Sequence, residues 1–108
     1  MHVRDDRMSS KGYIFAELDV HDAPAFYDDY MVKVRPILED YGAVFLCATN
    51  TPHVVEGGRI VRRVILIEFE SPARAREFFY SEGYQAIVDI RYRSAGAHLY
   101  FLDGLPSA

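Results

Sequence analysis

The chain has 108 residues, of which 50% are hydrophobic and 26% are charged, a composition typical of one globular domain that excludes an intrinsically disordered chain. The net charge of −4 argues against a nucleic-acid partner, because neutralising phosphates needs a cationic surface. The single cysteine, Cys47, excludes an internal disulfide.

The two ends of the chain are expected to be tails. Residues 1–11 are polar and charged and lack the apolar segment of a secretory signal, so a flexible tail is predicted there. One domain is predicted over residues 12–104, followed by a short tail over 105–108. No apolar run approaches the roughly 20 residues that cross a bilayer. We therefore expect no membrane partner and a cytoplasmic location.

The first half of the domain contains two predicted strands and a helix. Alternating apolar residues predict a strand over residues 12–20. Asp22 and Pro24 are typical of a helix start, and apolar side chains then recur at helical spacing. Pro36 falls inside this run and predicts a kink or a split. A second strand follows over residues 43–49.

The chain then turns back towards its most apolar strand. Residues 53–56 are predicted to extend the second strand irregularly, and Gly57-Gly58 is typical of a hairpin turn. The strongest strand pattern covers residues 62–69.

Two helices and a last strand complete the predicted domain. Ser71-Pro72 is typical of a helix start, and Ser81 is expected to cap a further short helix. That short helix carries Tyr84 and Arg91 on one face, because they are seven residues apart. Residues 97–102 form the last predicted strand.

This order of elements predicts an α+β fold of the ferredoxin-like, split βαβ kind. Such a fold has a four-stranded antiparallel sheet with helices on one face. Both registers of the predicted strands carry apolar residues, although the helices cover only one face. We expect a second copy of the chain to cover the other face, which predicts a homodimer.

A set of short motifs, in a fixed order, links the chain to a known family. They are Gly12-Tyr13, Tyr30, Tyr41-Gly42, Glu56-Gly57, Ile67-Glu68-Phe69, Ser71, Ser81, Tyr84-Gln85 and Arg91. Together they resemble domain-of-unknown-function family 1330, a branch of the dimeric α+β barrel superfamily. The resemblance implies a ferredoxin-like protomer and a dimer whose two sheets form a barrel. It implies no reaction, since that superfamily includes cofactor-free monooxygenases, lactone isomerases, haem-dependent peroxidases and ligand-binding domains.

Arg91 is the most informative candidate for a functional residue. Its helical face is otherwise apolar and is expected to point inward, where a guanidinium needs an anionic or carbonyl partner. One interpretation is an anchor for a substrate carboxylate, which arginine holds with two parallel hydrogen bonds. The alternative is an ion pair with one of three carboxylates, or a helix C-cap. Those carboxylates are Glu68, Glu17 and Glu56.

Two carboxylates and a histidine are candidates for proton transfer. Glu17 and Glu68 share a strand register with Tyr13 and His98. In a dimer cavity, one carboxylate would serve as a general base and His98 as an acid or base near neutral pH. The alternative is that the same residues form hydrogen bonds and salt bridges between subunits.

The remaining candidates have a functional and a structural interpretation. Tyr30 and Tyr84 would either hydrogen-bond a ligand or lie in the core with satisfied hydroxyls. Glu56 would either contact a ligand or pair with Arg59 or Arg62 in the hairpin. Cys47 is expected to be a small buried hydrophobe.

No bound cofactor is expected. The four histidines are scattered, no three or four metal ligands converge in sequence, and no glycine-rich loop precedes a helix to hold a phosphate. The sequence therefore predicts an uncharacterised dimeric α+β barrel protein. It would be a cofactor-free enzyme, isomerase-like or monooxygenase-like, acting on a small organic acid or aromatic metabolite. The alternative is a non-catalytic dimeric module for ligand binding or assembly.

Overall fold

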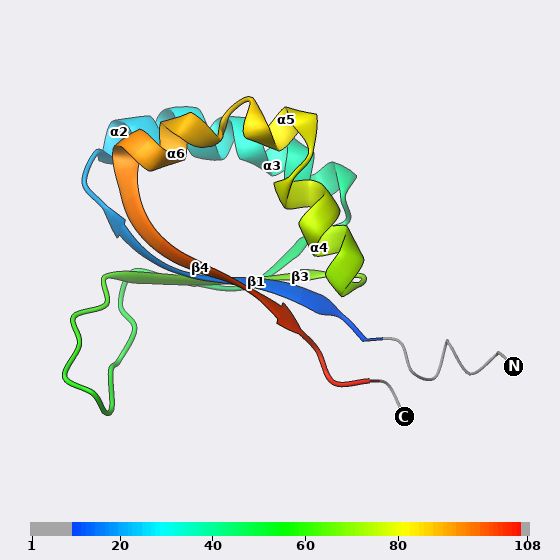
Figure 1. Cartoon of the computed structure of the whole chain (residues 1–108). Helices are drawn as coiled ribbons and strands as arrows, with labels where there is room; N and C mark the ends of the chain where they lie inside the picture. The colour runs from blue at the N-terminus through cyan, green and yellow to red at the C-terminus, as the bar shows by residue number, and fades with distance from the viewer. Residues whose placement is uncertain (1–9, 107–108) are drawn as a thin grey trace, which may run out of the picture.

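A four-stranded antiparallel sheet forms the base of the molecule (Figure 1). The computed structural model describes residues 10–106. Residues 1–9 of the tail predicted over 1–11, and residues 107–108 of the tail predicted over 105–108, therefore lie outside the described part. The strands are β1 (Gly12–Val20), β2 (Val44–Thr49), β3 (Arg63–Phe69) and β4 (Ala95–Asp103), in the spatial order β2-β3-β1-β4. This is the predicted ferredoxin-like arrangement.

The helices all lie on one face of this sheet (Figure 1). They are α2 (Ala23–Ala25), the π-helical segment η1 (Phe26–Tyr30), α3 (Met31–Asp40), α4 (Pro72–Phe79), α5 (Glu82–Gln85) and α6 (Val88–Ser94). We call the covered side of the sheet the helix face and the other side the open face. Within residues 10–106, no helix is both long enough and apolar enough to span a membrane.

The alternation of β1 separates the two faces. Ile14, Ala16 and Leu18 point to the helix face and are at most 5% exposed. Phe15 and Glu17, between them, point to the open face and are half-buried. The apolar residues of the helix face pack against the helices in one core, and this burial is the main stabilisation of the fold.

Three helix starts follow the capping chemistry that the sequence predicts. The side chain of Asp22 accepts a hydrogen bond from the Ala25 amide at 3.2 Å. Ser71 caps α4 in the same way, and Ser81 caps α5 by accepting from the Tyr84 amide at 3.1 Å. Each cap satisfies an amide that has no partner inside the helix.

The helical residues 23–40 differ from the prediction at Pro36. A split there is wrong, since α3 continues through Pro36, which is exposed. The irregularity lies upstream, where the Met31 amide bonds to the Phe26 carbonyl and closes the wider turn of η1. After Ser81 the chain forms two short helices, α5 and α6, where the sequence predicts one.

The connection between β2 and β3 is a loop. The predicted strand extension over residues 53–56 is wrong, because residues 50–62 pair with no strand and project beyond the open face (Figure 1). Gly57 and Gly58 form the predicted turn, and both have the positive φ that glycine tolerates. Pro52 lacks the amide donor of a sheet ladder and stands where the extension would begin.

Cys47 corrects a second expectation. Phe45 pairs with Ile67 and Cys47 with Leu66, so Leu46 is an extra residue that forms a β-bulge. The bulge moves Cys47 from the register of Phe45 to the register of Leu66, on the open face. In the single chain Cys47 is therefore exposed, where the unbroken alternation of the sequence predicts burial.

Candidate functional site

Two tyrosines and an arginine from three helical segments meet in the layer of helices. Tyr30 ends η1, Tyr84 lies in α5 and Arg91 lies in α6. Their exposed fractions are 7%, 2% and 6%. We call these three residues the phenol–guanidinium cluster.

Hydrogen bonds join the cluster into a short chain. The two phenol oxygens of Tyr30 and Tyr84 lie 2.7 Å apart, and the Arg91 Nε donates to the Tyr84 oxygen at 3.2 Å. Tyr30 and Tyr84 are 54 residues apart in sequence, so the fold alone brings their hydroxyls together.

Aromatic packing and helix caps fix the position of Tyr84. The Ser81 cap starts α5 three residues earlier, which turns Tyr84 inward. The ring of Tyr84 then packs against Phe78 and Phe79, with centroids 4.7 and 5.3 Å away. In α6, the helix that carries Arg91, the buried Ser94 hydroxyl donates to the Ile90 carbonyl at 2.6 Å. Aromatic neighbours and the start of α5 therefore hold Tyr84 in place.

The cluster has more donors than acceptors. The Arg91 Nε donates to the Tyr84 oxygen, and one of the two phenols donates its proton to the oxygen of the other phenol. Whichever phenol donates, the proton of the second has no acceptor among the hydrogen bonds of residues 10–106. The Arg91 guanidinium also has no carboxylate within salt-bridge distance in that part of the chain. The predicted ion pair with Glu68, Glu17 or Glu56 is therefore not formed.

Electrostatics keep Tyr30 in its protonated form. Burial raises the pKa of the Tyr30 phenol well above its usual 10, and the neighbouring Tyr84 raises it further. Arg91 lowers the pKa of Tyr30, but this effect is the smaller one. At neutral pH the phenol is thus a hydrogen-bond donor and not a base.

The predicted acid–base residues gather on the open face. The Tyr13 hydroxyl donates to Glu68 Oε2 at 3.3 Å, and Glu17 forms an ion pair with Arg59. Partial burial and the Glu68 carboxylate raise the pKa of Tyr13. His98 lies opposite Glu17 in the pairing of β1 with β4.

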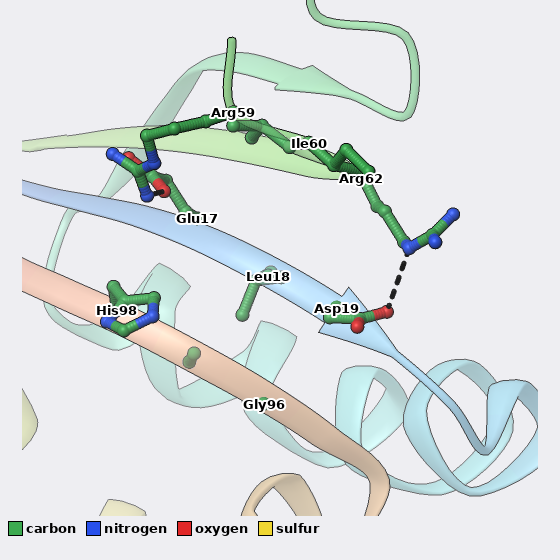
Figure 2. Close-up of a pocket in the computed structure, with 10 residues that line it drawn as sticks. Glu17, Leu18, Asp19, Arg59, Ile60, Arg62, Gly96 and His98 are labelled. Atoms are coloured by element: carbon green, nitrogen blue, oxygen red, sulfur yellow. Dashed lines mark hydrogen bonds and ion pairs between the residues drawn. The ribbon is translucent and has the colours of Figure 1, made fainter. Parts of the chain in front are cut away.

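A pocket of about 440 Å³ opens beside Glu17 and His98 (Figure 2). The loop segment Arg59–Arg62 forms one wall, and β1 and β4 form the floor. Figure 2 shows Arg59 beside Glu17, and Arg62 extended towards Asp19 at the end of β1. None of the phenol–guanidinium cluster lines this pocket.

The sheet thus divides the predicted site residues into two groups. Arg91, Tyr84 and Tyr30 meet on the helix face. The other group lies on the open face and comprises Glu17, Glu68, His98 and Tyr13. Within one chain, the four residues predicted as catalytic do not form a single site.

Glu56 belongs to neither group. It is exposed in the 50–62 loop, and its two expected partners bind other carboxylates, Arg59 to Glu17 and Arg62 to Asp19. The ion pair of Asp19 with Arg62 was not predicted from the sequence. The signal for it was that Asp19 points to the same face of β1 as Glu17.

No group of three or more His, Cys, Asp or Glu side chains is placed to hold a metal within residues 10–106.

Comparison with known proteins identifies the family. Residues 11–105 match the model of the family described as Domain of unknown function (DUF1330). The chain belongs to this family. The predicted resemblance is confirmed, and the DUF1330 match covers all the strands and helices described above. No curated protein matches the chain.

Solved structures share the DUF1330 fold seen here. The RPA0582 protein of unknown function from Rhodopseudomonas palustris has 19% identity and a TM-score of 0.72, over 95% of this chain and 88% of that one. A Caulobacter crescentus protein, provisionally described as an antibiotic biosynthesis monooxygenase, has 14% identity and a TM-score of 0.60, over 96% and 99%. SnoaB, a cofactor-independent oxygenase from Streptomyces nogalater, has 10% identity and a TM-score of 0.57, over 87% and 91%.

These identities are low, so the likeness establishes the fold alone. The protein is an α+β protein of the ferredoxin-like kind, and the solved structures that share its fold include proteins described as oxygenases.

Proposed function

We propose that this DUF1330 protein binds the anionic group of a small organic acid or aromatic metabolite at the phenol–guanidinium cluster. One observation carries the proposal: the cluster is buried, donor-rich and without an anion of its own in the described chain. A buried charge without a counter-charge is costly, and a bound carboxylate or enolate would compensate it.

The same donors suit cofactor-free catalysis. Donors that are already oriented in a site shielded from water stabilise negative charge that develops on an oxygen during a reaction. Arg91 and the spare phenol proton would act in this way on an enolate or phenolate oxygen. SnoaB, which shares the fold, is described as a cofactor-independent oxygenase, and this supports the same class of chemistry as the proposal for this chain.

Titration with simple acids and their amides tests the proposal. The probes are benzoate and hexanoate, each compared with its neutral amide, followed by calorimetry and by amide chemical shifts. We expect at least one acid to bind about tenfold more tightly than its amide, because a charge-assisted hydrogen bond contributes roughly 1.5–3 kcal/mol. Arg91→Met should remove this preference.

The matched control is Arg35→Met, which removes an exposed arginine of α3 and leaves the cluster intact. It should bind the acids as the unmodified protein does. Equal affinity for acid and amide, or acid binding that survives Arg91→Met, would contradict the proposal and favour a non-catalytic assembly module.

We further propose that the protein is a homodimer joined through its open faces. Large apolar side chains remain uncovered there, including Val44, Leu46 and Leu102, which are 42–52% exposed. Phe15 and Tyr100 form a ring pair with centroids 5.9 Å apart on the same face. Sedimentation at micromolar concentration should give about 25 kDa, twice the chain mass of 12.4 kDa. A mass near 12.4 kDa would exclude the dimer.

A further inference from the structure

A second arginine on the helix face, Arg63, has a buried N–H donor without a hydrogen-bond acceptor. Arg63 is the first residue of β3 and pairs with Leu18, which places its side chain on the helix face. Its Nη1 donates to Asn50 Oδ1 at 2.7 Å. Its Nε is buried and has no partner, alone among the buried side-chain nitrogens and oxygens of residues 10–106. Such an orphan donor needs an explanation, because leaving it unpaired costs about 1–3 kcal/mol.

Arg63 lines a pocket of about 230 Å³ near the end of β1. The lining residues are Val20, Ala23, Tyr27, Asn50, Arg62 and Arg63. Two of these six side chains are cationic and none is acidic. The Tyr27 ring centroid lies 5.7 Å from the guanidinium carbon of Arg63, so an aromatic face closes one side.

Neither of these two arginines has a strong anionic partner. Asn50, the hydrogen-bond partner of Arg63, is a neutral amide where a carboxylate would be expected beside a half-buried guanidinium. Arg62 faces Asp19 across 3.6 Å, and both side chains are about two-thirds exposed (Figure 2). An exposed pair at that distance contributes little, so Arg62 is free to turn towards the pocket.

We propose that this pocket binds a small oxyanion, a phosphate or carboxylate group, independently of the phenol–guanidinium cluster. The oxyanion would supply the negative charge that the lining lacks. It would also supply an acceptor for Arg63 Nε once the Arg63 side chain turns that atom from its buried position towards the pocket. The Nδ2 of Asn50 and the guanidinium of Arg62 would be further donors. The pocket is smaller than a typical ligand cavity of about 300–1,000 Å³, which fits a compact ion or the anionic end of a larger molecule.

Titration of the full chain with inorganic phosphate, and separately with acetate, tests this site and distinguishes the two anions. Amide chemical shifts of Val20, Ala23, Tyr27 and Asn50 should move in a saturable way with at least one of them. Arg63→Met should weaken that binding about tenfold or more, because it removes a charge-assisted donor. Arg35→Met and Arg91→Met should leave it within about twofold. The Arg91 variant thus separates this site from the proposed function.

A second variant keeps the test informative if Arg63→Met fails to fold. Asn50→Asp has nearly the same shape, lies in an exposed position and places a carboxylate beside Arg63. It should raise the unfolding temperature and abolish anion binding, because the site then carries its own anion. No saturable shift with either ion, or equal anion affinity in Arg63→Met or Asn50→Asp, would overturn the proposal.

Discussion

The two faces of the sheet differ in what they lack: the open face has uncovered apolar side chains, and the helix face has a buried arginine without an anionic partner among residues 10–106. On the open face, Glu17 pairs with Arg59 and Tyr13 donates to Glu68, while large apolar side chains stay exposed. On the helix face the apolar side chains are buried together, while Arg91 is 6% exposed and has no carboxylate within salt-bridge distance among residues 10–106.

This difference indicates what each face requires. A face with satisfied charges and uncovered apolar area is suited to another protein surface. A buried cluster with spare donors is suited to a small anion. The first requirement leads to a homodimer and the second to a ligand, so the two proposals rest on different residues and can fail separately.

Replacing one phenylalanine in the core beneath the helices, and one on the open face, with alanine should give the largest difference in lost stability. Phe78 is 3% exposed and packs against Tyr84 and Phe69, whereas Phe15 is half-buried on the open face. Phe78→Ala should lower the free energy of unfolding by about 3–5 kcal/mol. Phe15→Ala should cost less, and its cost should grow with protein concentration, because dimerisation contributes to stability. Urea unfolding at two concentrations measures both. Equal, concentration-independent losses would contradict the contrast.

A charge on the open face should break the proposed dimer. Leu66→Asp places a carboxylate in the middle of that face and should raise the dimer dissociation constant roughly 100-fold, about 3 kcal/mol. The matched control is Val32→Asp, since Val32 is 61% exposed on α3, away from the sheet. Sedimentation equilibrium should show a monomer for the first variant and a dimer for the second. Two dimers, or two monomers, would disprove the assignment of the interface.

The two phenols of the cluster should differ in their effect on stability. Tyr84 hydrogen-bonds both Tyr30 and Arg91, whereas the Tyr30 hydroxyl bonds Tyr84. Tyr84→Phe should therefore lower the free energy of unfolding by about 1–3 kcal/mol, and Tyr30→Phe by about 0.5–1.5 kcal/mol. Thermal and urea unfolding at pH 7 measure both, and the reverse order would contradict the hydrogen-bond chain.

The pH dependence of stability should report on Tyr30. Its pKa is raised in the folded protein, so folded and unfolded chains bind the same proton below pH 10 and differ above it. Above pH 10 the unfolded chain loses the proton first, so stability falls by up to about 1.4 kcal/mol per pH unit from this group. Tyr30→Phe should reduce that slope relative to the unmodified protein. An unchanged slope in Tyr30→Phe would contradict the burial effect.

Local patterns in the sequence were sufficient for most of the fold. The bounds of β1 follow from strict alternation, and the starts of α4 and α5 follow from Ser71 and Ser81, because these signals depend only on neighbouring residues. The bulge at Leu46 could not be predicted, since it depends on how β2 pairs with β3. It alone moves Cys47 to the open face.

The candidate site was predicted only in part for the same reason. Helical spacing placed Tyr84 and Arg91 together, and they are hydrogen-bonded even though the helix is broken between them. The bond between Tyr84 and Tyr30 joins segments that are distant in sequence, and no local pattern of residues predicts the π-turn that carries Tyr30. The separation of Arg91 from the carboxylates depends on the topology of the sheet.

A crystal structure with 4-bromobenzoate would test the central claim most directly, because the bromine marks the position of the ligand by anomalous scattering. The account predicts one strong bromine peak in the layer of helices, beside η1, α5 and α6, with the carboxylate hydrogen-bonded to Arg91 and a phenol of the cluster. The peak should disappear in Arg91→Met crystals. A peak in the open-face pocket beside Glu17 and His98, unchanged by Arg91→Met, would contradict it.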